Sequence, residues 1–174
     1  MTEPLRLGIA GLGTVGTGVI KIIRRQAALL EARTGRAIQI SAVSARDASK
    51  DRGVPLGDYA WETDPVALAT RDDVDVFVEL MGGHEGAAKD ATEAALAAGK
   101  DVVTANKALL AIHGQALAEQ AEAAGRVIRF EAAVAGGIPV IKSLTEGLAG
   151  NDVTRVMGVM NGTCNYILTQ MEAT

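Results

Sequence analysis

Residues 5–16, LRLGIAGLGTVG, decide the fold of this 174-residue chain. An apolar run leads into Gly11, Gly13 and Gly16, and apolar residues then recur at helical spacing as far as Leu30. Glycines in G-x-G-x-x-G register between a strand and a helix are typical of a turn that binds a dinucleotide. The alternative interpretation is a glycine-rich turn that only packs tightly.

Each glycine has a distinct expected task in such a turn. Gly11 allows the tight bend, Gly13 lets the backbone approach a pyrophosphate, and Gly16 permits close packing of helix on strand. The N–H groups at Thr14 and Val15, with the positive end of the helix, then favour the phosphate charge. We therefore expect these five residues to hold the pyrophosphate.

Short apolar segments alternate with longer alanine-rich segments along the chain. Strands that are apolar on both faces and alternate with helices are typical of a parallel sheet covered on both sides. The pattern predicts an α/β, doubly wound, Rossmann-type fold. The expected strands are residues 5–12, 37–44, 74–80, 101–105, 126–134 and 153–160. The expected helices follow residue 14, begin at Pro65 with Asp64 as N-cap, and cover residues 86–98, 106–124 and 138–148.

Length and glycine placement suggest one domain and the start of another. The segment LAGND, residues 148–152, is the expected boundary. Residues 1–150 would then form a dinucleotide-binding domain, and residues 151–174 the start of another domain.

Composition excludes several classes of protein. Hydrophobic residues make up 48% of the chain and aromatic residues 3%, so the core must be largely aliphatic. A net charge of −4 argues against a surface for nucleic acid or anionic membrane. Cys164 is the single cysteine, the amino terminus does not resemble a signal peptide, and no apolar stretch is long enough to span a bilayer. We expect a cytoplasmic protein.

The segment VSARD, residues 43–47, follows the second expected strand and bears on the choice of coenzyme. An acidic residue at this place holds a ribose 2′-hydroxyl, whereas an arginine accepts a 2′-phosphate. Arg46 therefore favours NADP over NAD, while Asp47 keeps NAD open. A solvated loop arginine without a ligand is the alternative.

Two further segments follow the third and fourth expected strands, where a ligand crevice is expected. Gly82 lets the backbone run close to the coenzyme, whereas His84 is more typical of an exposed loop histidine. Thr104 offers a hydroxyl, and Lys107 offers a charge near a nicotinamide or a carboxylate substrate. The alternative for the second segment makes Asn106 a helix N-cap and Lys107 a surface residue.

The segment EAAVAGGIP, residues 131–139, follows the fifth expected strand. Its glycines free backbone carbonyls, and Glu131 adds a carboxylate. Oxygen ligands of this kind suit a hard cation better than zinc. A flexible turn that carries the chain into a second domain is an equally good interpretation.

Five segments in order resemble one family, the homoserine dehydrogenases. The resemblance is to the amino-terminal part of these enzymes, it extends over essentially all 174 residues, and NGTCNYIL preceded by GGIPVI is its most specific part. The segments are GLGTVG, ELMGG, TANK, EAAVAGGIPVI and MNGTCNYIL. The family reduces aspartate β-semialdehyde to homoserine with NADPH or NADH, on the route to threonine and methionine.

The resemblance implies a role for each matching residue. Arg46 would hold the 2′-phosphate of NADP, and Gly82, Thr104 and Lys107 would line the coenzyme cleft. Backbone carbonyls would supply most ligands of a monovalent cation, with sodium the usual occupant. The residues of that metal site are Glu131, Val134, Gly136 and Ile138.

The same resemblance implies that residues 151–174 are the beginning of a truncated α+β substrate and dimerisation domain. Asn161 and Thr163 would face the crevice between nicotinamide and substrate, and Tyr166 would lie in a packing helix, with Cys164 a small buried hydrophobe. The family's proton-donating lysine has no match here, so we expect no catalytic residue in these 174 residues and little or no turnover. The full protein would be a homodimer.

Two other interpretations remain open from the sequence. One is another semialdehyde or amino-acid dehydrogenase with the same coenzyme half, although NGTCNYIL argues against it. The other is a non-catalytic sensor or assembly module that binds NADP.

Overall fold

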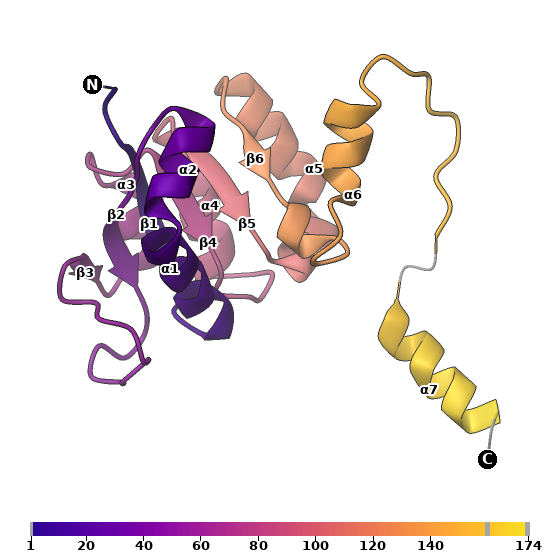
Figure 1. Ribbon diagram of the computed structural model, residues 1–174, viewed down its shortest axis with the longest axis horizontal. Helices are drawn as coiled ribbons and strands as arrows, with labels where there is room; N and C mark the ends of the chain where they lie inside the picture. The colour runs from indigo at the N-terminus through magenta and orange to yellow at the C-terminus, as the bar shows by residue number, and fades with distance from the viewer. Residues whose placement is uncertain (1, 159–160, 173–174) are drawn as a thin grey trace. The chain divides into compact units, whose positions relative to one another are not determined.

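A computed structural model describes residues 2–158 and 161–172, and its first unit is built around a six-stranded sheet (Figure 1). Every strand pair is parallel, and the strand order is β3-β2-β1-β4-β5-β6. The order reverses between β1 and β4, which is the hallmark of a doubly wound sheet. The predicted Rossmann-type fold is therefore confirmed. The strands are β1 (Leu5–Ala10), β2 (Ile38–Ser44), β3 (Ala60–Glu62), β4 (Val76–Glu79), β5 (Asp101–Thr104) and β6 (Ile128–Arg129).

Helices cover both faces of the sheet, and each face has its own apolar core (Figure 1). Alternate residues of a strand point to opposite faces, so Ile9 packs with Ile20 of α1 while Ala10 packs in the cluster that contains Leu109 of α5. The helical elements are α1 (Thr14–Arg25), α2 (Ala27–Thr34), α3 (Pro65–Thr70), α4 (Ala87–Ala97), α5 (Lys107–Ala123), η1 (Glu131–Ala133), α6 (Val140–Lys142), η2 (Ser143–Gly147) and α7 (Gly162–Glu172).

One helix begins at the cap that the sequence predicts, Asp64, and another at Asn106, the cap that was the alternative interpretation of its segment. The Asp64 carboxylate accepts a hydrogen bond from the Val66 N–H at 2.9 Å, and Pro65 is the first residue of α3. The Asn106 side chain accepts one from the Leu109 N–H at 3.1 Å at the start of α5. Both caps satisfy an N–H group that has no partner within its helix.

The chain divides into two compact units, residues 1–134 and residues 135–174. This division falls earlier than the domain boundary expected at residues 148–152, and the assignment of domains itself stays a prediction. Among the residues described in either unit, no helix is both long and apolar enough to cross a membrane.

Several expected elements differ from the observed ones. Residues 153–158 form no strand, and residues 159–160 lie outside the described residues. A strand needs a partner for its hydrogen-bond ladder, and within the described part of the chain this segment has none. The expected strand 126–134 shortens to β6 and the turn η1, and the expected helix 138–148 is the short α6 followed by the π-turn η2. Cys164 is exposed, not buried as expected.

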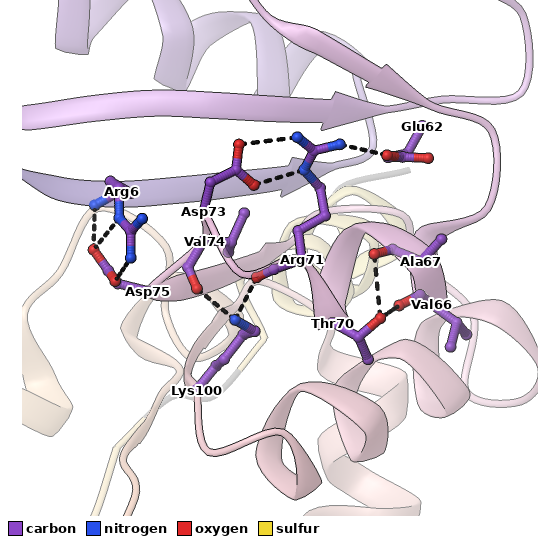
Figure 2. A network of polar contacts seen from close by, with 10 residues as sticks. All are labelled: Arg6, Glu62, Val66, Ala67, Thr70, Arg71, Asp73, Val74, Asp75 and Lys100. Carbon is purple, nitrogen blue, oxygen red and sulfur yellow. Dashed lines mark hydrogen bonds and ion pairs between the residues drawn. The ribbon is translucent and has the colours of Figure 1, made fainter.

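Charged residues gather where β1, β4 and β5 begin, and Figure 2 shows their contacts. The Arg6 guanidinium donates to both carboxylate oxygens of Asp75, at 2.7 and 3.2 Å. The Lys100 ammonium, nearly buried, donates to the main-chain carbonyls of Arg71 and Val74. These contacts join the loop before β4 to the first residues of β1 and β5, so they fix the amino ends of the central strands.

Candidate functional site

A cleft of about 730 Å³ opens beyond the carboxyl ends of β1, β2 and β4. It lies where the strand order reverses, the place at which open α/β sheets bind ligands. The residues that line it are Gly11, Leu12, Gly13, Ser44, Ala45, Arg46, Asp47, Lys50, Arg52, Thr63, Pro65, Leu80, Met81, Gly82, Glu85, Ala87 and Ala88. All belong to the first compact unit.

Gly11 and Gly16 are required by the packing of the turn itself. Gly11 has a φ of +99°, and a Cβ there would lie 2.4 Å from the carbonyl oxygen of Leu80. A Cβ at Gly16 would lie 2.0 Å from the carbonyl oxygen of Gly11. No side chain can be accommodated at such distances, so the turn packs against both the end of β4 and the first turn of α1.

Gly13 differs because the space around it is open. An added Cβ would meet no described atom within 4 Å, and Gly13 is the N-cap of α1 without a side chain to cap it. The first N–H groups of a helix have no partner within the helix, and no acidic residue occupies this first turn. Open space, free donors and the positive helix end together fit a phosphate group. Thr14 and Val15 are exposed at the same end.

Cations line the part of the cleft after β2. The Arg46 side chain forms no hydrogen bond or ion pair with any residue that the structure describes. Lys50 also lines the cleft, and Arg52 stacks over the Trp61 ring at 5.5 Å. Arg52 also donates to the main-chain carbonyls of Asp47 and Lys50, so its position is fixed by the loop itself. These last two cations were not predicted from the sequence, since a loop lysine or arginine carries no local signal of where its side chain lies.

Asp47 is the one carboxylate in this cationic part of the lining. Its side chain accepts hydrogen bonds from the Ser49 hydroxyl at 2.7 Å and from the Ser49 N–H at 2.9 Å. These bonds hold the pKa of Asp47 below its ordinary value. One of its two oxygens is therefore already engaged within the loop.

A second cavity, of about 170 Å³, adjoins the first because the two share Leu80, Met81 and Gly82. Its remaining lining residues are Val15, Ala105 and Asn106. Gly82 and Gly83 both have positive φ, 79° and 85°, which a non-glycine residue rarely adopts. Gly82 therefore lies at the wall of the cleft, and its role beside a coenzyme stays a prediction.

Thr104 and Lys107 lie outside the lining of both cavities. Thr104 is fully buried, and its hydroxyl donates to the carboxylate of Glu79 at 2.6 Å. Lys107 is exposed at the first position of α5. Glu79 is a further residue that the sequence analysis missed, although a carboxylate at the end of the apolar run VDVFVEL was a visible signal.

The histidines have different surroundings. His84 is exposed, as expected for a loop histidine. His113 of α5 lies 2.7 Å from the carboxylate of Glu85, a cleft residue, and this contact lowers the pKa of Glu85. The contact joins α5 to the loop that follows β4.

Comparison with known proteins identifies the family. A family model described as the NAD binding domain of homoserine dehydrogenase matches residues 11–131, and a second, described as homoserine dehydrogenase, matches residues 139–174. The chain belongs to the homoserine dehydrogenase family. Both cavities lie entirely within the residues that the NAD-binding model covers.

Individual homoserine dehydrogenases are similar over almost the whole chain. That of Neisseria gonorrhoeae is 46% identical over 169 residues, which is 97% of this chain and 38% of the relative. That of Mycobacterium tuberculosis is 47% identical over 172 residues, 99% of this chain and 38% of the relative. The crystal structure of a homoserine dehydrogenase from Thiobacillus denitrificans superposes with a TM-score of 0.86 at 40% identity, covering 99% of this chain and 39% of that one. The chain thus spans well under half the length of these homoserine dehydrogenases.

The four residues expected to hold a cation fall on both sides of the division between the units. Glu131 and Val134 belong to the first unit, and the Val134 N–H donates to the Glu131 carbonyl at 3.2 Å. Gly136 and Ile138 belong to the second unit. Among the described residues no three His, Cys, Asp or Glu side chains gather as metal ligands. A site made mostly of main-chain carbonyls is not tested by that search and stays a prediction.

Asn161 and Thr163 lie at the start of α7. The Asn161 side chain accepts a hydrogen bond from the Cys164 N–H at 2.9 Å, so it caps this helix. Thr163 is exposed in the first turn. The predicted helix after NGT is therefore present, while the role of both residues near a homoserine dehydrogenase substrate stays a prediction.

Proposed function

We propose that the chain is the coenzyme-binding part of an enzyme that reduces L-aspartate 4-semialdehyde to L-homoserine with NAD(P)H, in threonine and methionine biosynthesis. Membership of the family and a cleft built on the glycine turn support this proposal. The observation that carries it is the open space at Gly13 beside the uncapped start of α1, which suits a pyrophosphate.

NADP is the proposed coenzyme, with NAD accepted more weakly. A 2′-phosphate adds about two negative charges, and Arg46, Lys50 and Arg52 line the part of the cleft after β2 that faces this group in dinucleotide-binding folds. Arg46 is uncommitted among the described residues, whereas Arg52 is already oriented by Trp61 and two carbonyls. Asp47 leaves one acceptor oxygen for a ribose hydroxyl, so NAD remains acceptable.

The chemistry divides between the coenzyme and the protein. The reduced nicotinamide supplies a hydride to the aldehyde carbon, and a proton added to the oxygen completes the alcohol. A proton donor must lie within hydrogen-bond reach of that oxygen. No residue of this chain matches the family's lysine donor, so we propose that residues 1–174 alone bind coenzyme and turn over little or no substrate. A turnover assay beside the full-length Mycobacterium tuberculosis homologue tests this.

Further parts of the proposal come from the family resemblance. Asn161 and Thr163 would lie near the substrate. Glu131, Val134, Gly136 and Ile138 would bind a monovalent cation, most simply sodium. The whole enzyme would be a cytoplasmic homodimer.

Calorimetric titration of residues 1–174 with NADP⁺ and NAD⁺ tests the coenzyme assignment. We expect Arg46→Ala to weaken NADP⁺ binding about 10- to 100-fold, the worth of a charge-assisted hydrogen bond, and to leave NAD⁺ affinity within about twofold. Arg126→Ala, at an exposed position before β6, is the control for loss of one positive charge.

The outcomes separate the two parts of the assignment. If the folded wild-type chain binds neither dinucleotide, the coenzyme-binding function is wrong. If Arg46→Ala weakens both dinucleotides equally, or neither, the assignment of Arg46 to the 2′-phosphate is wrong.

A further inference from the structure

Glu79 is a charged residue in an unusually dry place. It is the last residue of β4, and its exposed fraction is 0%. One carboxylate oxygen accepts the N–H groups of Met81 at 2.7 Å and Gly82 at 3.1 Å, and the other accepts the Thr104 hydroxyl at 2.6 Å. All three donors are neutral. Burial of a carboxylate is costly even when it is hydrogen-bonded, so its presence calls for a reason beyond packing.

Asn106 extends this network. Its main-chain N–H donates to the Thr104 hydroxyl oxygen at 3.0 Å, and its side-chain amide donates to the Gly83 carbonyl. The remaining oxygen of that amide caps α5. Glu79, Thr104 and Asn106, which we call the Glu79 clamp, therefore tie the loop after β4 to the loop after β5.

The clamped loops form the wall of the smaller cavity. Met81 and Gly82 line both cavities, and Asn106 lines the smaller one. Gly82 and Gly83 have positive φ, and an added Cβ would meet no described atom within 4 Å at either position. Both glycines have open space beside them, so the hydrogen bonds of the clamp restrain their backbone, together with the packing of Met81 against the apolar core.

The smaller cavity lies on the side of the cleft that receives the nicotinamide half of a dinucleotide. The end of β2 takes the adenosine ribose and the start of α1 takes the pyrophosphate, and the dinucleotide then crosses the point of strand reversal toward β4 and β5. Resting on the proposed function, we propose that the Glu79 clamp positions the nicotinamide half of the coenzyme by holding the Met81–Gly83 loop. Glu79 and Thr104 do not touch the coenzyme themselves but position the loop that does. A loop that is already ordered before binding loses less conformational entropy when the coenzyme binds.

Thr104→Val tests the clamp at a single buried position. Valine keeps the shape of threonine but removes the donor to Glu79 and the acceptor for the Asn106 N–H. We expect the Kd for NADP⁺ to rise about tenfold. The Kd for adenosine 2′,5′-bisphosphate, which lacks the nicotinamide half, should stay within about twofold. Thr104→Ser, which keeps the hydroxyl, should restore most of the NADP⁺ affinity.

Thr92→Val is the matched control. Thr92 is also fully buried, but its hydroxyl donates to the Ala88 carbonyl within α4 at 2.7 Å. The same chemical change at Thr92 should alter the Kd for NADP⁺ and the Kd for adenosine 2′,5′-bisphosphate by the same factor. If the role of Thr104 is only structural, Thr104→Val should weaken the binding of both ligands. The clamp predicts weaker binding of the dinucleotide alone.

The proposal has outcomes that overturn it. Equal weakening of both ligands in folded Thr104→Val, or no change in either, contradicts the clamp. Failure of the wild type to bind either ligand contradicts the proposed function instead. Should Thr104→Val not fold, amide hydrogen exchange on the wild type decides: Met81 and Gly82 should exchange slowly, at a rate set by opening of the clamp, and rapid exchange at both would refute it.

Discussion

At the amino ends of β1, β4 and β5, charged side chains are paired with one another or with carbonyls, whereas at the carboxyl ends polar groups remain available. Arg6 is paired with Asp75, and Lys100 donates to two carbonyls (Figure 2). At the opposite end, Arg46 has no partner among the described residues, and the first N–H groups of α1 have no cap. The amino end is thus organised for stability and the carboxyl end for a ligand.

Glu79 shows how the carboxyl end remains ordered despite this. Its carboxylate accepts hydrogen bonds from two main-chain N–H groups and a hydroxyl, and from no cation among the described residues. The loop is therefore held without engaging Arg46. The same sheet therefore uses ion pairs at one end and neutral donors at the other. Substitutions at the amino ends of the strands should therefore change the free energy of unfolding without changing coenzyme binding, whereas substitutions at the carboxyl ends should change coenzyme binding.

Gly16→Ala should give the largest effect, because it disturbs both properties at once. A Cβ 2.0 Å from the Gly11 carbonyl oxygen forces α1 away from the turn, and we expect a loss of about 3 kcal/mol in unfolding free energy together with loss of NADP⁺ binding. Gly18→Ala is the control in the same helix, where an added Cβ meets nothing within 4 Å. That substitution should stabilise by about 0.5–1 kcal/mol. Urea unfolding and calorimetry measure both, and similar results for the two variants would contradict the packing argument.

Lys100→Met should reduce stability but not coenzyme binding. Methionine fills similar space but removes the donor to the Val74 carbonyl and leaves the Arg71 carbonyl only the Val74 N–H at 3.3 Å, which should cost about 1–2 kcal/mol in urea unfolding. Lys89→Met removes instead an ammonium that pairs with Glu93 along α4, and should cost less than about 0.5 kcal/mol. A change in the Kd for NADP⁺ with Lys100→Met would show that the two ends of the sheet are not independent.

Asp75→Asn should have the smallest effect, and it should depend on pH. Hydrogen bonds from Arg6 hold the pKa of Asp75 below its ordinary value. The ionised carboxylate therefore adds stability above the ordinary carboxyl pKa of about 4, and this part is lost as the pH falls through the lowered pKa. The wild type should be more stable than Asp75→Asn at pH 7 and should lose that advantage toward pH 2. Urea unfolding at both pH values measures it, and a difference that does not vary with pH would exclude the ion pair as its source.

Local signals in the sequence predicted much of the fold. Asp64 with Pro65, and Asn106 before α5, mark helix starts by chemistry that acts within one turn. The alternation of apolar strands with helices predicted the doubly wound sheet. The prediction of strands was wrong where a strand depends on pairing with a segment that is distant in the sequence. The strand expected at residues 153–160 has no partner in the described region, and β3 forms only because Ala60–Glu62 reach the edge of β2.

For the site, too, the sequence predicted local backbone features but not contacts between distant residues. The bend at Gly11 and the close packing at Gly16 follow from the local glycine pattern, because backbone geometry of this kind is encoded over a few residues, while binding of a coenzyme by these glycines and Gly82 stays a prediction. Thr104 was expected in the cleft but donates to Glu79 beneath it, and the two are 25 positions apart in sequence. No local pattern reports a contact of that range.

By itself, then, the sequence determined the parallel sheet, the glycine turn and the family, because hydrophobic periodicity and backbone conformation are encoded over a few residues. Only the tertiary structure decided which polar side chains are committed and which are left for a ligand. Among the described residues Arg46 has no partner, Arg52 is held over Trp61, and Glu79 is buried and accepts hydrogen bonds from the Met81–Gly83 loop. The physical reason is that hydrogen bonding and burial depend on atoms brought together by strands that are adjacent in the sheet and distant in the chain.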